Sequence, residues 1–386
     1  MQILIAPNSF KNSLSAKLVA EAISKGLLRS RLECTTDCFP VGDGGDGTAA
    51  LIVDRMGGRI VNTKVHDPLG REISATFGLV DKDKTAVIEL ADASGIRLLQ
   101  PAEYDPLHCT TFGTGELIRS SLQTGVEKII ICVGGSATID GGTGILRALG
   151  IKFYDDNENE LCQMPGILTN LKRIDESGLE KQLLQTEVVV LCDVENVLLG
   201  VNGAAKIFGP QKGANQEQVN QLESALAKWN EIVQMKKGED MSLITHGGAA
   251  GGVAAGLQTF LGAKLVKGIN YFLELVGFRE ALKKANIVIT GEGSIDEQTL
   301  NGKAPLGVAK LAKEAGLPVV AVSGQVPQYE IKQLREYFDV ILPINHEAVD
   351  LLNAIKYTYD NLLRTGQELG NLLALEEIIK NKEGEG

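Results

Sequence analysis

The stretch that decides the fold is Ile3-Leu4-Ile5-Ala6-Pro7, near the start of the chain. It is apolar, too short for a helix and followed directly by proline, so it predicts a buried β-strand. After a short loop, apolar residues recur at helical spacing from Leu18 to Leu27, with Ser13 or Ser15 as the candidate N-cap. The N-terminus therefore predicts a strand–loop–helix unit of the α/β kind.

Similar units return near the C-terminus. Apolar runs at 287–289, 318–322 and 340–343 predict strands, and 308–315 predicts a helix. Short all-apolar strands that alternate with helices indicate a parallel sheet covered on both faces. Because the first strand has the same character, we predict one Rossmann-like domain built from both chain ends, residues 1–62 plus 276–386.

The middle of the chain has a different pattern. Alternating segments at 72–78 and 85–90, joined by the turn 81–84, predict a β-hairpin and hence some antiparallel sheet. Further runs at 128–133 and 188–192 predict more strands. We therefore expect residues 63–275 to form an inserted mixed α/β domain, with the site in the cleft between the two domains.

Composition narrows the class of protein. The 386 residues carry a formal charge of −11, which disfavours nucleic acid or an anionic membrane as a partner. The six cysteines include no C-x-x-C pair, and neither a signal peptide nor a membrane-spanning run is present in the sequence. We expect a cytoplasmic protein, either a monomer or a homodimer.

Ligands of open α/β sheets bind beyond the carboxyl ends of the strands, so the loops there are the candidate site. In the first loop, Asn8-Ser9-Phe10-Lys11, a lysine just before a helix would add positive charge to an anion site, although a solvated lysine is the plainer interpretation. The second, Gly42 to Thr48, contains Asp43 and Asp46. Two carboxylates there would repel a bare pyrophosphate but suit Mg²⁺ together with phosphate, and a simple Gly-Asp turn is the alternative.

The third loop runs from Gly134 to Gly142 and contains Gly134, Gly135, Ser136 and Thr138. Glycines let the backbone approach a ligand closely, and consecutive N–H groups form an anion nest. A purely structural turn rarely needs so many glycines, so a phosphate-binding role is favoured.

Two further loops carry charged side chains. Asp193 follows the strand at 188–192, where it could act as a base or metal ligand or could cap a helix, and Lys212 lies in Pro210–Ala214. The loop 290–303 contains Glu292, Asp296 and Lys303 together with Gly291, Gly293 and Gly302, and could hold a metal and a phosphate. The segment 246–252 is interpreted as a tightly packed turn into a helix.

Several motifs are missing from the sequence. It contains no G-x-x-x-x-G-K-[ST], no G-x-S-x-G and no H-E-x-x-H, and its four histidines lack metal-ligand spacing. Carboxylates, lysines, hydroxyls and glycine nests remain. This set of groups suits Mg²⁺-dependent phosphoryl transfer, in which catalysis is mostly positioning and charge neutralisation.

The sequence resembles the bacterial glycerate kinases of the type that commonly makes 2-phosphoglycerate. The resemblance covers nearly the whole chain, in order, and rests on these strings: Ala6 to Lys11, Asp43 to Thr48, Gly134 to Gly142, Cys192-Asp193-Val194, Pro210 to Ala214 and Thr290 to Lys303. It implies ATP- and Mg²⁺-dependent phosphorylation of D-glycerate to phosphoglycerate, with the 2-phospho product favoured and the 3-phospho product possible. It also implies a two-domain α/β protein.

We hypothesise roles for some of these residues. Asp193 would orient or deprotonate the attacking hydroxyl, Lys11 would neutralise charge on a carboxylate or phosphate, and Asp43 and Asp296 would hold Mg²⁺. The remaining candidates for binding substrate or phosphate are Asn8, Ser9, Gly134, Gly135, Ser136, Thr138, Lys212, Gly291, Gly293 and Lys303. A nicotinamide-dependent dehydrogenase of a small hydroxy acid and a non-catalytic anion-binding protein stay as alternatives.

Overall fold

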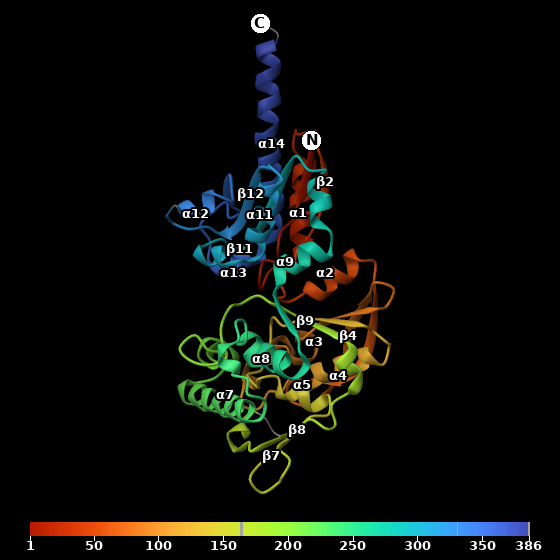
Figure 1. Cartoon of the computed structure of the whole chain (residues 1–386). Helices are drawn as coiled ribbons and strands as arrows, with labels where there is room; N and C mark the ends of the chain where they lie inside the picture. The colour runs from red at the N-terminus through yellow and green to blue at the C-terminus, as the bar shows by residue number, and fades with distance from the viewer. Residues whose placement is uncertain (163–164, 330, 385–386) are drawn as a thin grey trace. The chain divides into compact units, whose positions relative to one another are not determined.

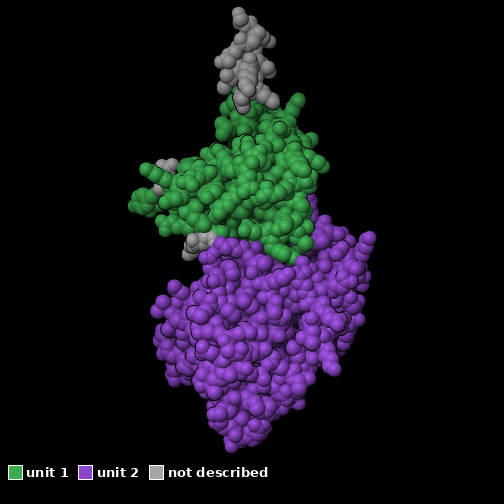
Figure 2. Space-filling view, viewed as in Figure 1, with its two compact units in different colours: residues 1–43, 269–386 green, residues 44–268 purple. Residues whose placement is uncertain are grey.

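The computed structural model describes residues 1–162, 165–329 and 331–384, without the side chains of 298, 301 and 376–384. Contacts between residues divide the chain into two compact units (Figure 2). Unit 1 comprises residues 1–43 and 269–386, and unit 2 comprises residues 44–268.

Unit 1 takes its elements from both ends of the chain (Figure 1). Its strands and helices are β1 (Gln2–Ile5), α1 (Ala16–Leu28), β2 (Thr35–Cys38), α9 (Gly268–Leu275), α10 (Phe278–Leu282), β11 (Ile287–Ser294), α11 (Ala304–Glu314), β12 (Val319–Gln325), α12 (Lys332–Arg335), β13 (Val340–Pro343), α13 (Leu351–Lys356) and α14 (Thr358–Gly384).

The strands of unit 1 form a parallel sheet in the order β13-β12-β11-β1-β2. The first strand of the chain pairs with a strand from the C-terminal part, with Ile3 opposite Ile287 and Ile5 opposite Ile289. Ile3 and Ile5 are fully buried because helices pack on the sheet. This pairing confirms the predicted parallel sheet built from both chain ends.

Unit 2 contains α2 (Thr48–Arg55), β3 (Arg59–His66), β4 (Glu72–Val80), β5 (Thr85–Glu89), α3 (Ala91–Ser94), α4 (Phe112–Leu122), β6 (Lys128–Cys132), α5 (Thr143–Ala148), β7 (Lys152–Tyr154), β8 (Arg173–Asp175), β9 (Glu187–Cys192), α6 (Ala204–Phe208), α7 (Gln216–Lys237), α8 (Ala249–Leu261) and β10 (Lys264–Lys267). Its larger sheet has the order β10-β9-β6-β5-β4-β3, and β7 and β8 form a separate antiparallel pair.

The larger sheet of unit 2 is mixed, as predicted. The strands β3, β4 and β5 are antiparallel neighbours, whereas β5, β6, β9 and β10 run parallel. The parallel strands β5, β6 and β9 end together, because Glu89 is opposite Cys132 and Cys132 is opposite Leu191. The loops that follow these three strands therefore begin at one edge of the sheet.

Local signals explain most element boundaries. Of the two candidate caps of α1, the structure selects Ser15, whose side chain accepts a hydrogen bond from the Leu18 N–H. The helix predicted at 308–315 begins earlier, at Ala304, because Pro305 in its first turn is already compatible with helical geometry. The α/β class is confirmed, while the domain boundaries 1–62 plus 276–386 and 63–275 stay a prediction.

The described residues contain no helix that is both long and apolar enough to cross a bilayer.

A close helix contact in unit 1 yields a stability prediction. A Cβ on Gly26 of α1 would lie 2.1 Å from the Leu363 carbonyl oxygen of α14, which runs beside α1 (Figure 1). Helix propensity alone would make Gly26→Ala stabilising by about 1 kcal/mol. We expect the steric clash to outweigh this gain, so that Gly26→Ala lowers the free energy of unfolding by about 1–3 kcal/mol, as measured by chemical denaturation. The exposed Leu28→Ala is the control, and a Gly26→Ala protein at least as stable as wild type would contradict this packing.

Candidate active site

Unit 1 collects polar side chains where β1 and β11 end. The chain leaves β1 beside β11, since the Asn8 N–H donates to the Gly291 carbonyl at 2.8 Å. Asn8 is buried, and its Nδ2 donates to Asp43 Oδ2 at 2.9 Å. The Ser9 N–H in turn donates to Asn8 Oδ1 at 2.8 Å. Asn8 thus links the first loop to the second and fixes the orientation of the Asp43 carboxylate.

The centre of this group is Glu292, which is 9% exposed. Its Oε1 accepts a hydrogen bond from Thr299 Oγ1 at 3.2 Å and lies 4.0 Å from Lys303 Nζ. Lys303 Nζ is also 3.7 Å from Asp296 Oδ1. Burial, together with the charges of Asp43 and Asp296, raises the pKa of Glu292 to about 7, against the lowering effect of Lys303. We call Asp43, Glu292 and Asp296 with Lys303 the carboxylate cluster.

Two predicted positions lie near this cluster on the backbone. Gly291 and Gly293 are residues of β11 itself. A Cβ on Gly293 would be 3.8 Å from the Lys11 backbone nitrogen, so the first loop passes beside this strand. The Lys11 side chain is exposed. It does not directly precede the helix, contrary to expectation, because residues 10–14 close a turn and α1 begins only at Ala16.

Unit 2 contains the glycine loop, residues 134–142, directly after β6. The Gly134 N–H donates to the Gly44 carbonyl at 3.0 Å. Gly135 has a φ of +68°, and a Cβ there would lie 2.1 Å from Asp46 Oδ1. Only glycine allows the loop to pass this close to Asp46 in a left-handed conformation. The two glycine-rich loops of unit 2 are therefore packed directly against each other.

A buried carboxylate shapes the far end of the glycine loop. Asp140 is fully buried and accepts hydrogen bonds from Thr111 Oγ1 at 2.7 Å and from the N–H groups of Thr111, Gly142 and Gly144 at 2.8, 3.0 and 3.2 Å. Burial raises the pKa of Asp140, while these hydrogen bonds oppose the shift. The carboxylate thus holds the N–H groups that start α5 and bends the loop around itself.

Lys212 holds the near end of the same loop. Its side chain is buried, and Nζ donates to Ser136 Oγ at 2.7 Å and to the Thr138 carbonyl at 2.8 Å. Burial lowers the pKa of Lys212 to about 7, although Asp140, Cys109 and Asp193 favour its charged form. A neutral amine has two N–H donors, and these two acceptors use both.

Asp193 is the residue after the end of β9, and it is exposed. The negative charge of Asp193 is close enough to Lys212 to raise the pKa of that amine. Unit 2 therefore brings Asp193, Lys212, Ser136 and the backbone of Thr138 into one neighbourhood. The Thr138 hydroxyl is different: its Oγ1 is buried, with no hydrogen-bond partner among the described residues.

The sequence analysis missed Glu89 at the end of β5. This carboxyl is 4% exposed, and its Oε2 accepts the Ala49 N–H of α2 at 3.0 Å. Burial, followed by the charges of Asp46 and Asp92, raises its pKa to about 8. Its Oε1 is buried without a partner among the residues described. A single acidic residue that ends an apolar strand was the available signal.

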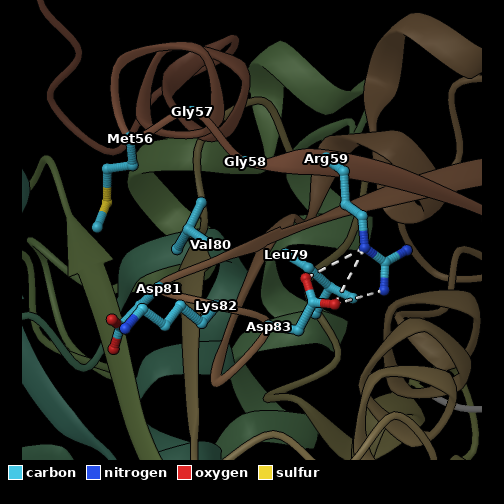
Figure 3. A pocket seen from close by; sticks show the side chains of 9 residues that line it. All are labelled: Met56, Gly57, Gly58, Arg59, Leu79, Val80, Asp81, Lys82 and Asp83. Atoms are coloured by element: carbon cyan, nitrogen blue, oxygen red, sulfur yellow. Dashed lines mark hydrogen bonds and ion pairs between the residues drawn. The ribbon is translucent and has the colours of Figure 1, made fainter.

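An open pocket in unit 2 lies at the other end of β5 (Figure 3). It is lined by the turn at 81–83 and by Arg59, whose Nη2 is 2.8 Å from Asp83 Oδ2. This turn precedes β5, whereas Glu89 ends that strand. The pocket is therefore distinct from the loops at the carboxyl ends of the strands.

No three or more His, Cys, Asp or Glu side chains within the described ranges are placed to hold a metal ion by themselves. Mg²⁺ in phosphoryl-transfer sites is commonly bound by one or two carboxylates, substrate phosphates and waters. The carboxylate cluster offers that smaller set, with Asp43 and Asp296 close enough to Glu292 to raise its pKa. The donor chemistry therefore fits Mg²⁺ that arrives with a nucleotide.

Comparison with known proteins agrees with this chemistry. A family model described as Glycerate kinase family matches residues 3–374. A glycerate kinase from Halalkalibacterium halodurans is 43% identical over 84% of this chain and 86% of its own. A glycerate 2-kinase from Escherichia coli K12 is 39% identical over 97% of this chain and 98% of its own.

A crystal structure of a Salmonella typhimurium LT2 protein assigned as glycerate kinase 2 is also similar. It has a TM-score of 0.81 at 40% identity and covers 98% of this chain and 99% of that one. The fold and these matches define an α/β kinase with an alcohol group as acceptor. The chain belongs to the glycerate kinase family.

The buried amine of Lys212 yields a prediction for stability against pH. Its folded pKa of about 7 lies below the ordinary 10.5. Between these values the unfolded chain binds more protons, so the free energy of unfolding rises with pH, by up to about 1.4 kcal/mol per unit. Lys212→Met should remove this contribution, and its stability should rise less than that of wild type from about pH 7 to about pH 9.5.

Urea unfolding of wild type and variant at both pH values measures the difference. The exposed Lys181→Met is the control and should parallel wild type. If Lys212→Met also parallels wild type, the amine is charged in the folded protein and the assignment of a neutral lysine is wrong.

Proposed function

We propose that this protein transfers the γ-phosphoryl group of ATP to D-glycerate and forms 2-phosphoglycerate. The observation that carries the proposal is the family match over residues 3–374, together with a relative named glycerate 2-kinase aligned over 97% of the chain. The groups in the candidate site are compatible with this reaction. Both units offer carboxylates and lysines at the carboxyl ends of parallel strands.

We assign Asp193 as the base that orients and deprotonates the attacking hydroxyl of the substrate. An exposed carboxylate at a strand end can accept the proton of a substrate hydroxyl and orient that hydroxyl toward phosphorus. The charge of Asp193 in turn favours the protonated form of the nearby Lys212 amine. Asp193 is therefore a suitable base in unit 2.

We assign anion binding to the glycine loop and to the basic side chains of unit 1. Because the Gly134 N–H donates to the Gly44 carbonyl, we assign phosphate or carboxylate oxygens to the neighbouring Gly135 N–H, and Lys212 keeps Ser136 in place beside it. Lys11 and Lys303 would neutralise charge on substrate groups that bind unit 1. Within the first loop, Asn8 orients Asp43 by donating to its carboxylate, and the Ser9 N–H donates to Asn8.

Asp43 and Asp296 are our choice for holding Mg²⁺, with Glu292 as a third carboxylate beside them. Bound there, the ion would neutralise the charge of the nucleotide phosphates. The protein's own part is to hold these carboxylates in place: Asn8 orients Asp43, and Lys303 lies between Asp296 and Glu292.

The activity is tested by ADP release from ATP and Mg²⁺, with and without D-glycerate. We expect release that depends on glycerate and is lost when EDTA removes Mg²⁺, because the phosphate charges are then unneutralised. Phosphorus NMR of the product distinguishes the 2-phosphoglycerate that we propose from 3-phosphoglycerate. Folded protein that binds ATP but releases no ADP with glycerate would contradict the proposal.

Asp193→Asn tests the assigned base. Asparagine keeps the shape of the side chain but cannot accept the proton, so we expect kcat to fall by about 10²–10⁴-fold with an unchanged fold. Asp156→Asn is the matched control, because Asp156 is an exposed carboxylate paired with Lys172. Steady-state kinetics and circular dichroism provide the measurement, and near-normal turnover of Asp193→Asn would end the assignment.

A further inference from the structure

The turn of residues 246–252, before and within the start of α8, lies against both the Asp193 loop and the glycine loop. His246, Ala250 and Gly251 have positive φ angles of 67°, 51° and 70°. His and Ala are uncommon in this left-handed region, and each costs free energy there unless the surroundings hold it. Contacts on both sides of the turn hold these residues in place.

On one side the turn binds the segment after Asp193. His246 Nδ1 lies 2.6 Å from the Val194 carbonyl oxygen. A carbonyl only accepts, so Nδ1 carries the hydrogen and donates it. The Gly248 N–H donates to the Asn196 carbonyl at 2.8 Å. Two carbonyls within three residues of Asp193 are thus bound by one turn.

On the other side the same turn binds the glycine loop. The Gly251 carbonyl accepts the Gly141 N–H at 3.0 Å. A Cβ on Gly251 would lie 2.1 Å from the Thr138 carbonyl oxygen, so the two backbones are in direct contact. The Thr138 carbonyl is also the acceptor of Lys212. The turn therefore connects the position of the Asp193 segment to the loop that Lys212 organises.

We propose that His246 is a positioning residue for phosphoryl transfer: through the Val194 carbonyl it holds Asp193 at a fixed place relative to the glycine loop. This inference rests on the proposed function, in which Asp193 meets the substrate hydroxyl. Asp193 is exposed and lies beyond the last residue of β9, so the strand ladder alone does not fix it. A misplacement of about 1 Å at such a group can cost about 10²-fold in rate.

The test compares His246→Gly with His246→Asn. Glycine accepts the positive φ but removes the donor, whereas asparagine tolerates the same φ and places an N–H donor at the δ position. We expect His246→Gly to lower kcat by about tenfold or more and to leave the KM for ATP within about twofold. His246→Asn should recover kcat to within about threefold of wild type.

Two further variants separate positioning from stability. In an Asp193→Asn background, His246→Gly should cause almost no further loss, because it acts through a carboxylate that is no longer functional. Ala250→Gly relieves a positive φ in the same turn without removing the His246 donor, and should leave kcat unchanged.

Equal kcat in wild type and His246→Gly would overturn the proposal, as would a loss that is fully additive with Asp193→Asn. A kcat of His246→Asn as low as that of His246→Gly would also overturn it, provided that both variants remain folded by circular dichroism. A wild-type protein without glycerate-dependent turnover would instead count against the proposed function, so the two failures are distinguishable.

Discussion

The buried pair of polar anchors in unit 2, Lys212 and Asp140, is the constraint on which the rest of the site depends. Lys212 Nζ holds Ser136 and the Thr138 carbonyl, and Asp140 gathers the N–H groups of Thr111, Gly142 and Gly144. Burying such groups costs free energy unless they are hydrogen-bonded. The loop must therefore adopt the conformation that keeps these hydrogen bonds. The loop is thereby shaped before any ligand arrives.

The electrostatics of the two units are complementary in kind. In unit 1 burial, together with the charges of Asp43 and Asp296, raises the pKa of Glu292 to about 7. In unit 2 burial lowers the pKa of Lys212 to about 7. Burial thus shifts the pKa of an acid in unit 1 and of a base in unit 2 toward neutrality from opposite sides, and unit 2 also holds the buried acid Glu89 with a pKa raised to about 8. Such perturbed groups gather at functional sites.

The sequence predicted what depends on local pattern. Apolar runs and alternating segments located most strands of the two larger sheets but not β2, β3 and β10, and glycine density located the loop at 134–142. It could not predict which charged side chains are buried, because burial is set by tertiary packing: Lys212 looked like a phosphate ligand and proves to be enclosed. Glu89 was overlooked because a single acid at a strand end carries little information without its partners.

Hydrogen exchange of individual amides, followed by NMR in the protein without nucleotide, tests most directly whether the glycine loop is preformed. We expect slow exchange of the Thr111, Gly142 and Gly144 amides, since Asp140 binds all three in the folded protein. Addition of ATP and Mg²⁺ should change them little. Rapid exchange without nucleotide, with protection only after its addition, would show that the ligand and not Asp140 orders the loop, and would contradict a preformed glycine loop.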